Sequence, residues 1–360
     1  MAEKTNPTTR RPLHQRSRRT APAIVLAAAI FMIMGSCAGP AEQSRIRPEI
    51  FWPSPPAVKR IAFVGAVSEP ADLNIRAGML KRIVAYVVGA GTAPMVSPYG
   101  LATDAGGRLY VVDTFLKRVH VFDAEDNRYF FFPADRSILA SPVGIAVDNR
   151  DRVYVSDSKL GVVFLFKDGG ETFVTTFGRG IFERPTGIAV NPRTSELLVV
   201  DTLQSQVFRF GLERQELKGS FGSGGAAAGR FHYPTNIFVT ASGEIVISDT
   251  LNFRVQVFSP QGRHLSTIGS AGDVPGTFSR PKGVAADSDG NIYVVDGLFD
   301  NIQIFDKGGQ LLMAFGEHGT DDGEFWLPSG IYIDDNDLIY VSDSSNRRVQ
   351  IFKYLKEEGS

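Results

Sequence analysis

From Tyr99 to the end of the chain, short apolar runs alternate with turn residues in a pattern that recurs about six times. Each copy contains a Pro-x-Gly sequence, with Asn236 in place of the Gly in the fourth copy, then a short apolar strand, a turn, an apolar run that ends in Asp, and a strand that ends in Phe. The Asp positions are Asp113, Asp157, Asp201, Asp249, Asp296 and Asp343, and the Pro positions that keep step with them are Pro98, Pro142, Pro185, Pro234, Pro281 and Pro328. A repeat of about 45 residues with four short strands per unit predicts a β-propeller.

The strands are visible within a single unit. Residues 291–295 (NIYVV) and 301–305 (NIQIF) are rich in β-branched and aromatic residues, lie between turn residues, and are too short for helices. The fifth unit is therefore predicted to have strands at residues 283–286, 292–295, 302–305 and 311–315. Its turns carry Gly290, Gly308 and Gly309, and glycine supplies the positive φ that tight hairpins need.

The last unit lacks its fourth strand, because it stops after Phe352. Residues 61–65 (IAFVG) have the apolar pattern of residues 311–316 (LLMAFG) and are predicted to supply the missing strand. A strand taken from the N-terminal side would close the ring and remove exposed edges. The prediction is an all-β, six-bladed propeller in one domain, residues 59–358.

The repeated phrases also carry a family resemblance. PTGIAV, GNIYVVD, SNRRVQIF and FGEHGTDDGEFWLP resemble NHL repeats, and the resemblance extends over residues 97–352. With two Trp and no Trp-Asp dipeptide, the chain is unlike WD40 propellers. The first unit departs most, since residues 131–135 (FFPAD) replace the FGxxGxxxGxF passage, and the second has a shortened form at residues 177–180. The resemblance implies a six-bladed β-propeller.

The first 36 residues predict export. Five arginines precede an apolar run at residues 21–34, and Gly35 and Ser36 lead to Cys37, the single cysteine of the chain. A basic head, a short apolar stretch and small residues at the cut are typical of a signal peptide. The end of this segment resembles a bacterial lipobox, which implies acylation of Cys37 and a membrane-anchored lipoprotein of the bacterial envelope, in the periplasm or at the outer membrane. The alternative is an uncleaved anchor helix with an incidental Cys.

We make a separate structural prediction for each of the two segments that follow. Residues 37–58 are rich in proline and predict an extended tether. Residues 71–90 have apolar side chains at helical spacing and predict an amphipathic helix that begins at Asp72 and stops at Gly89. This helix would pack on the propeller, or it would cover the channel or contact anionic lipid through Arg76, Lys81 and Arg82.

The net charge of the predicted mature chain limits the classes of partner that it is expected to bind. Removal of residues 1–36 takes six of 38 Lys and Arg and one of 39 Asp and Glu, which leaves 32 basic and 38 acidic residues. A mildly acidic domain argues against nucleic-acid binding, because binding to phosphates needs a basic surface. If Cys37 carries lipid, no cysteine is left for a structural disulfide.

The recurring Asp has two interpretations. A ring of carboxylates could hold metal, but each Asp lies where the second strand turns into the third, and in three units Arg follows five residues later: Asp113 and Arg118, Asp249 and Arg254, Asp343 and Arg348. An Asp at this point can accept hydrogen bonds from turn N–H groups and from Arg. A structural role is expected, because a catalytic group seldom recurs in every repeat.

Two groups of residues on one face are candidates for function. The apolar candidates for a protein interface are Phe115, Leu116, Phe253, Leu298 and Phe299. The candidates for a ligand site at the channel mouth are Arg184, His232, Tyr233, Asn236, Arg280 and Lys282. The first group could instead pack against neighbouring blades, and the arginines of the second group could instead cap loop carbonyls.

Two function classes remain open. The sequence favours a lipid-anchored protein-binding or assembly platform, because its strong signals are explained without catalysis or a cofactor. The alternative is a metal-dependent lyase or hydrolase, because propeller lyases that process peptidyl-hydroxyglycine resemble this fold and use a metal held by His. The mature chain has only four His, at 120, 232, 264 and 318, and they are out of register in the repeats. Fold alone does not choose between the two.

Overall fold

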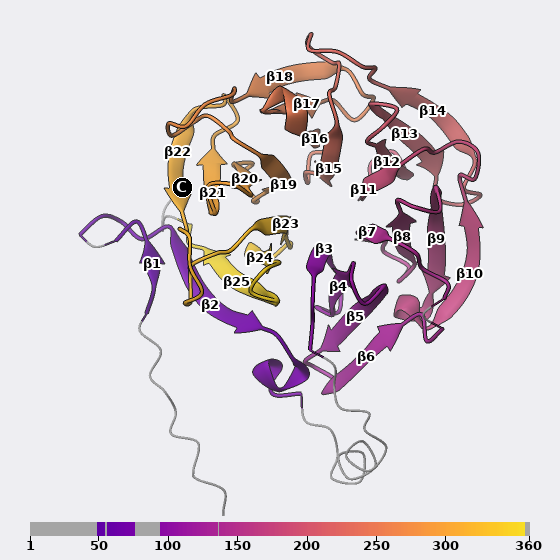
Figure 1. Cartoon of the computed structure of the whole chain (residues 1–360), viewed down its shortest axis with the longest axis horizontal. Helices are drawn as coiled ribbons and strands as arrows, with labels where there is room; N and C mark the ends of the chain where they lie inside the picture. The colour runs from indigo at the N-terminus through magenta and orange to yellow at the C-terminus, as the bar shows by residue number, and fades with distance from the viewer. Residues whose placement is uncertain (1–48, 55, 76–93, 136, 357–360) are drawn as a thin grey trace, which may run out of the picture. The chain divides into compact units, whose positions relative to one another are not determined.

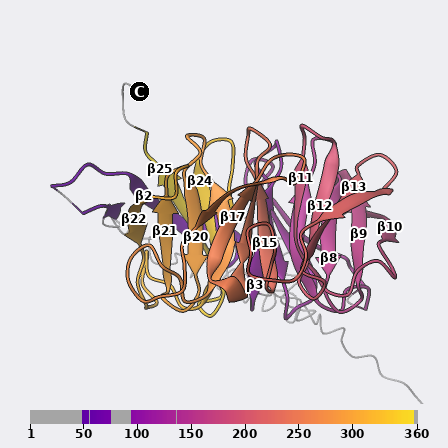
Figure 2. The ribbon, with the colours of Figure 1, turned by 90° about the horizontal axis from the view of Figure 1, so that it is seen from above.

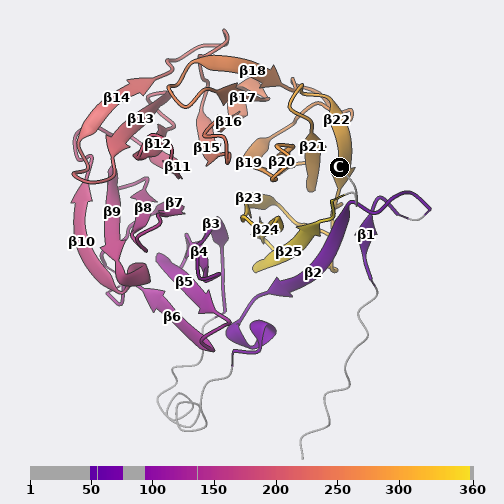
Figure 3. The same ribbon diagram turned by 180° about the vertical axis from the view of Figure 1, so that it is seen from behind.

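The computed structural model describes residues 49–54, 56–75, 94–135 and 137–356. The predicted signal peptide, Cys37, residues 37–48 of the predicted tether and most of the predicted helix lie outside these residues. The described strands form six antiparallel sheets arranged round a common axis, as Figures 1 and 3 show from opposite sides. The prediction of an all-β, six-bladed propeller is confirmed.

The strand bounds follow the repeat. In the list for each blade the strands run from the centre outward. Blade 1 consists of β3 (Pro98–Thr103), β4 (Leu109–Asp113), β5 (Arg118–Asp123) and β6 (Arg128–Phe132). Blade 2 consists of β7 (Pro142–Val147), β8 (Val153–Asp157), β9 (Val162–Lys167) and β10 (Thr172–Phe177). Blade 3 consists of β11 (Pro185–Asn191), β12 (Glu196–Asp201), β13 (Gln206–Gly211) and β14 (Leu217–Phe221).

The other three blades continue the pattern. Blade 4 consists of β15 (Pro234–Val239), β16 (Ile245–Asp249), β17 (Arg254–Phe258) and β18 (His264–Ile268). Blade 5 consists of β19 (Pro281–Ala286), β20 (Ile292–Asp296), β21 (Asn301–Phe305) and β22 (Leu311–Phe315). Blade 6 consists of β23 (Pro328–Ile333), β24 (Leu338–Asp343), β25 (Arg348–Tyr354), β2 (Ile61–Val67) and β1 (Phe51–Trp52).

Blade 6 combines the two ends of the described chain. Its fourth strand, β2, pairs antiparallel with β25, so that Ile61 lies opposite Tyr354 and Val67 lies opposite Val349. β1 adds a fifth strand, although the sequence placed residues 51–52 in the tether. The difference arises because the ring of Trp52 packs 5.5 Å from that of Phe315 and 5.7 Å from that of Phe352. An extended tether away from the propeller would not make these aromatic contacts.

The segment after β2 begins differently from the predicted helix. Residues Pro70–Leu73 form a short 3-10 helix, η1, whose N-cap is Glu69 and which ends at Asn74 with a left-handed φ of 59°. The prediction that Asp72 caps the helix is wrong, because Asp72 lies within η1 and its Oδ2 accepts the N–H groups of Ser68 and Glu69. Residues 76–93, with the predicted stop at Gly89, lie outside the described residues.

Apolar side chains fill the spaces between neighbouring blades. The cluster between blades 1 and 2, for example, joins Val121 and Phe132 to Ile145 and Phe164. Near the axis the innermost strands come so close that, in the five blades with a Pro-x-Gly sequence, a Cβ on its glycine would press against the next blade. A Cβ on Gly330 of blade 6 would lie 2.0 Å from the carbonyl oxygen of Tyr99 in blade 1. The repeat therefore encodes the tight packing round the central axis.

Candidate functional site

One face of the propeller carries almost every candidate residue. The turns between the second and third strands of each blade, the loops between blades and the Pro-x-Gly corners all lie at the same ends of the strands. We call this the loop face. The opposite face carries the turns between the first and second and between the third and fourth strands, and Figure 2 shows the propeller edge-on between the two.

The recurring Asp residues hold the loop face together. In blade 2, Asp157 Oδ2 accepts the N–H groups of Ala140 and Ser141 in the preceding loop, and Oδ1 accepts that of Leu160 in its own turn. The other five Asp residues also accept backbone N–H groups from the loop that enters their blade. All six are fully buried. These contacts use the carboxylate oxygens within the fold.

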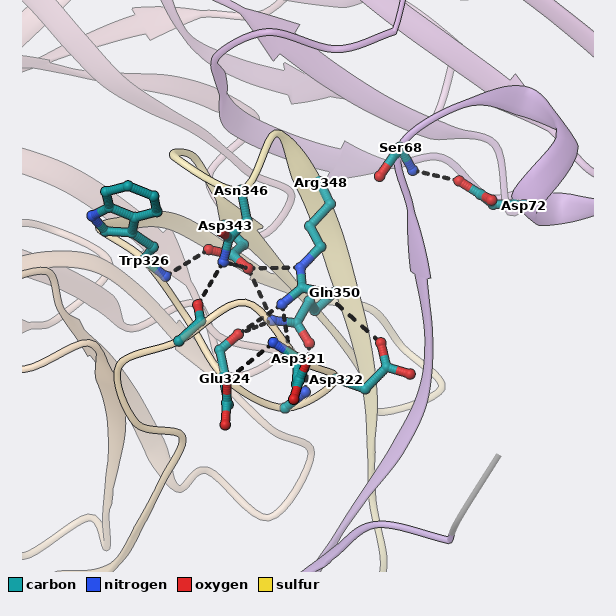
Figure 4. A network of polar contacts seen from close by, with 12 residues as sticks. Ser68, Asp72, Asp321, Asp322, Glu324, Trp326, Asp343, Asn346, Arg348 and Gln350 are labelled. Atoms are coloured by element: carbon teal, nitrogen blue, oxygen red, sulfur yellow. Dashed lines mark hydrogen bonds and ion pairs between the residues drawn. The ribbon is translucent and has the colours of Figure 1, made fainter. Parts of the chain in front are cut away.

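Blades 4 and 6 add side chains to this arrangement. In blade 6, Asp343 Oδ2 accepts hydrogen bonds from Arg348 Nε at 2.8 Å, Asn346 Nδ2 at 2.9 Å and Gln350 Nε2 at 3.1 Å, and Oδ1 accepts the N–H of Trp326 (Figure 4). Blade 4 repeats the network with Asp249, Asn252, Arg254 and Gln256. The two predicted Asp–Arg pairs in these blades are thus ion pairs that tie the turn to the loop.

Blade 1 differs from this pattern. His120 occupies the position of Gln350, and its Nε2 lies 3.6 Å from Asp113 Oδ2 while its Nδ1 lies 2.8 Å from the hydroxyl of Tyr129. The guanidinium of Arg118 lies over the ring of Phe131. Burial lowers the pKa of His120. Burial tends to raise the pKa of Asp113, but the neighbouring imidazole of His120 and hydrogen bonds from the N–H groups of Val96 and Leu116 hold it below its usual value.

Sequence reasoning missed a second set of buried carboxylates, on the opposite face. In four blades an Asp at the end of the innermost strand accepts the hydroxyl of a Tyr six residues later: Asp104 and Tyr110, Asp148 and Tyr154, Asp287 and Tyr293, Asp334 and Tyr340. Burial raises the pKa of each of these Tyr hydroxyls. Blades 3 and 4 lack both partners, having Leu198 and Val246 at the Tyr position. The Asp and the Tyr occur together in four blades and are both absent from the other two, and this co-occurrence in the sequence could have revealed the pairing.

Exposed apolar side chains lie on the loop face of several blades. Phe115 is 70% exposed and Leu298 is 52% exposed, whereas the predicted Leu116, Phe253 and Phe299 are half-buried. The structure adds Trp326 and Leu327, which sequence reasoning missed although they stand together in the loop that enters blade 6. We call the exposed set the apolar rim; it consists of Phe115, Leu160, Leu203, Leu251, Leu298, Trp326 and Leu327.

The channel mouth lies inside this rim, at the Pro-x-Gly corners. Arg184 of blade 3 donates a hydrogen bond from Nη1 to the hydroxyl of Tyr233 of blade 4 at 2.6 Å. Tyr99 of blade 1, which the sequence analysis did not single out, lines the central cavity, and Arg280 and Tyr233 are near enough to affect the pKa of its hydroxyl. Burial raises the pKa of Tyr99, although the charge of Arg280 acts to lower it. Residues from four blades therefore meet at this mouth.

Two further candidates lie beside the mouth. Lys282 Nζ lies 3.4 Å from the carbonyl oxygen of Pro328, and burial followed by the nearby charge of Arg280 lowers its pKa. Asn236 occupies the position of the Pro-x-Gly glycine in blade 4 and lines the channel. His232 donates its backbone N–H to Asp249 and has an exposed side chain. The structure thus groups the cationic candidates and places His232 at the edge of the loop face.

Below the mouth is a central cavity of about 340 Å³. It is lined by the innermost strands, with Tyr99 and Asn236 toward the loop face and Ser288 and Asp335 toward the opposite face. Within it, the ring of Phe238 in blade 4 lies 6.1 Å from that of Tyr332 in blade 6.

The described residues contain no group of three or more His, Cys, Asp or Glu side chains arranged to hold a metal ion. His318 Nδ1 lies 2.7 Å from Asp300 Oδ2, and His264 Nε2 lies 3.0 Å from the Thr267 hydroxyl, so with His120 on Tyr129 three of the four His are held by neighbours within the fold. The metal site that a lyase would need is therefore without a recognisable ligand set in this part of the chain.

Comparison with known proteins places the fold in context. The NHL repeat family matches residues 278–305 and 325–352, which lie in blades 5 and 6. No curated protein matches the sequence. A protein of unknown function from Bacteroides thetaiotaomicron has a similar structure, with a TM-score of 0.59, 18% identity, and coverage of 73% of this chain and 70% of that one.

Two other solved structures are similar at the level of the fold. An auxiliary nutrient binding protein from Bacteroides thetaiotaomicron has a TM-score of 0.58 and 16% identity, and covers 73% of this chain and 70% of its own. Virginiamycin B lyase from Staphylococcus aureus has a TM-score of 0.54 and 12% identity, with coverage of 72% and 96%. The six sheets make the chain a six-bladed β-propeller, and residues 278–305 and 325–352 of it match the NHL repeat.

Proposed function

We propose that this propeller binds a protein partner on its loop face and serves as a recognition or assembly platform. The observation that carries the proposal is the apolar rim, because large apolar side chains are exposed on turns of five successive blades and on the loop that enters the sixth. Scattered apolar residues are normal on a protein surface, but a set gathered on one face is typical of a binding surface.

The arrangement of the rim supports this proposal. Its side chains project from turns that the buried Asp residues fix to the neighbouring loops, as Asp157 fixes Leu160 and Asp296 fixes Leu298. A rim on turns held in this way loses little conformational freedom on binding, which lowers the cost of association. The buried hydrogen bonds thus support a preformed surface.

The proposal includes a place in the cell. We propose that Cys37 is acylated after removal of residues 1–36 and that the protein is an exported, membrane-anchored lipoprotein of the bacterial envelope. Among the described residues no helix is long and apolar enough to cross a membrane. Replacing Cys37 with Ser is expected to abolish incorporation of a labelled fatty acid and to release the protein from the membrane fraction. If this variant still incorporated label and sedimented normally, the anchor assignment would be wrong.

The alternative of a metal-dependent lyase or hydrolase has less support. Virginiamycin B lyase shares the fold, but an identity of 12% supports the fold alone. The described residues also offer no cluster of metal-binding side chains. No specific observation at the channel mouth favours catalysis over binding.

Two residues of matched exposure test the proposed surface. Leu298 on the rim is 52% exposed and Leu312 on the outer strand β22 is 51% exposed, and both belong to blade 5. Leu298→Ser combined with Phe115→Ser should weaken capture of the native partner about tenfold or more, which is what one aromatic anchor contributes. Leu312→Ser combined with Leu265→Ser of β18 should leave capture unchanged.

The melting temperatures of both double variants should stay close to that of the parent protein, because the four side chains are exposed. Equal capture by the two double variants would contradict the proposal. A large fall in the melting temperature of the rim variant alone would mean that these side chains belong to the core.

A further inference from the structure

The channel mouth gathers cationic and hydroxyl donors from separate blades. Arg184 comes from blade 3, Tyr233 from blade 4, and Arg280 and Lys282 from blade 5, and Tyr99 of blade 1 lines the cavity just below them. Guanidinium, ammonium and phenol groups can all donate hydrogen bonds to an anion. Residues that are far apart in the sequence therefore form one donor-rich cluster at the axis.

The nearby carboxylates, Asp296 and Asp300, act on Lys282 and also accept hydrogen bonds within the fold. Asp296 accepts the N–H groups of Ser279, Arg280 and Leu298. Asp300 accepts the N–H of Leu327 at 2.7 Å and lies 2.7 Å from His318 Nδ1. Among the described residues the guanidinium of Arg280 makes no hydrogen bond and no ion pair, and its side chain is exposed. The mouth therefore keeps a positive charge that can meet an incoming anion.

Tyr233 provides a second, independent observation. Its backbone has a φ of 60°, in the left-handed region, which is unfavourable for a residue with a bulky aromatic side chain. Leu327, which precedes the Pro of blade 6 as Tyr233 precedes that of blade 4, has a similar φ of 51°, and in Tyr233 the hydroxyl accepts a hydrogen bond from Arg184. Backbone strain of this kind persists where the surrounding structure maintains it, and it is concentrated at binding and catalytic sites.

We propose that the channel mouth binds a carboxylate group that the partner protein presents between apolar side chains. This inference rests on the proposed function, because it names the ligand group that binds at the centre of the same protein-binding surface. The planar guanidinium groups of Arg184 and Arg280 match the geometry of a carboxylate, and the phenol hydroxyls of Tyr99 and Tyr233 donate to its oxygens. The apolar rim outside the mouth accommodates the apolar residues that flank the carboxylate.

A protein segment fits this surface better than a free anion does. The basic groups stand at the axis, while the rim residues Phe115, Leu203 and Leu298 stand on turns farther out. A small anion would use the centre alone and would leave the rim exposed. A segment with one Asp or Glu side chain, or a C-terminal carboxylate, among apolar residues complements both parts.

The test uses matched peptides with the full-length protein. The probes are acetyl-Leu-Glu-Leu-amide and acetyl-Leu-Gln-Leu-amide, titrated by calorimetry at low ionic strength, where charge pairs are least screened. The Glu peptide should bind about tenfold more tightly than the Gln peptide, as a charge-assisted pair provides. The combined substitutions Arg184→Gln and Arg280→Gln should remove this difference.

A matched control distinguishes an effect of the cations at the channel mouth from an effect of the protein's overall charge. Arg214→Gln removes an exposed cation from the turn between β13 and β14, on the opposite face, and should leave the preference for the Glu peptide intact. Sodium acetate should compete with the Glu peptide only weakly, because it lacks the flanking apolar groups.

Several results would overturn the inference. Equal affinity for the two peptides, or no binding of either, would show that the mouth does not select a carboxylate. Tighter binding of inorganic phosphate, or of phosphatidylglycerol vesicles, than of the Glu peptide would assign the mouth to another anion or to a membrane surface. If the peptides bound equally while the rim substitutions still abolished capture of the partner, the proposed function would stand and only the carboxylate assignment would fail.

Discussion

His120 and Tyr129 are joined inside blade 1 by a contact of 2.8 Å between the imidazole Nδ1 and the phenol oxygen. His120 is only 1% exposed, and it occupies the position at which blades 4, 5 and 6 have Gln256, Gln303 and Gln350. One blade therefore carries a titratable group where three others carry a neutral amide.

This contact predicts a pH dependence of stability. Burial holds the pKa of His120 below the ordinary value of 6.5, so the unfolded chain takes up a proton more readily than the folded one. The contribution of His120 is fully present above pH 6.5 and is lost as the pH falls below 6.5 toward the folded pKa. Asp113, Arg118 and Tyr129 are the polar and charged groups that face the ring.

The variant His120→Gln isolates this contribution. Free energies of unfolding from urea titrations at about pH 7.5 and about pH 5 should fall less for the variant than for the parent protein. Gln keeps a hydrogen-bonding amide at a site where the fold already uses one, so the variant should fold. An identical pH dependence of the two proteins would show that His120 does not titrate as the structure indicates.

The close approach of neighbouring blades predicts an effect of Gly330→Ala. The added Cβ would meet the Tyr99 carbonyl, where blade 6 contacts blade 1, and this backbone cannot move without opening the ring. The substitution should reduce the free energy of unfolding by about 2 kcal/mol or more. Gly224→Ala, where no atom lies within 4 Å of the new Cβ, is the control and should have little effect. Similar melting temperatures for the two variants would contradict this packing.

The buried hydrogen-bond networks predict that Asp→Asn will reduce the free energy of unfolding by different amounts in blades 6 and 2. Asp343→Asn leaves the guanidinium of Arg348 without its carboxylate and should cost about 3 kcal/mol. Asp157→Asn loses acceptors for backbone N–H groups but leaves no cation behind, so it should cost less, about 1–2 kcal/mol. Chemical denaturation of the two variants gives the comparison, and a larger cost for Asp157→Asn would show that the Arg348 pair contributes little.

The N-terminal strands predict a graded effect of truncation. A form that begins at Glu49 should be as stable as the whole domain, because it retains β1 and β2. A form that begins at residue 57 loses the packing of Trp52 on Phe315 and Phe352 and should melt at a lower temperature. A form that begins at Val67 also loses the pairing of β2 with β25 and should be least stable. Equal melting temperatures for the last two forms would show that β2 does not close blade 6.

The sequence predicted the fold well where one residue type has the same task in every repeat. The Pro that opens each unit and the Asp at the end of the second strand are visible because they recur in all six units, and the six blades follow from them. Asp104 and Tyr110 were missed, because their pairing spans a turn and is absent from two blades. Trp52 was missed because its partners, Phe315 and Phe352, are remote in sequence and come together only when the ring closes.

The candidate site was predictable only in part. The positions of Arg184, Tyr233, Arg280 and Lys282 before or after a Pro placed them at the mouth, since those corners repeat round the axis. The role of Tyr99 was not predictable, because the residues that affect the pKa of its hydroxyl, Tyr233 and Arg280, belong to blades 4 and 5 and are remote in sequence. Exposure depended on the position within the turn. Leu251 and Leu298, two residues after the Asp, are exposed, whereas Phe253, four residues after it, is half-buried.

Site-specific photo-crosslinking in cells tests the proposed binding surface most directly. A photoreactive amino acid at Leu298 or Phe115 on the loop face should give a discrete adduct with one partner, whereas the same amino acid at Leu312 or Leu265 on the outer strands should give none. Leu298 and Leu312 are almost equally exposed, so the comparison depends on the face and not on accessibility. Adducts from the outer strands alone, with none from the loop face, would contradict the account.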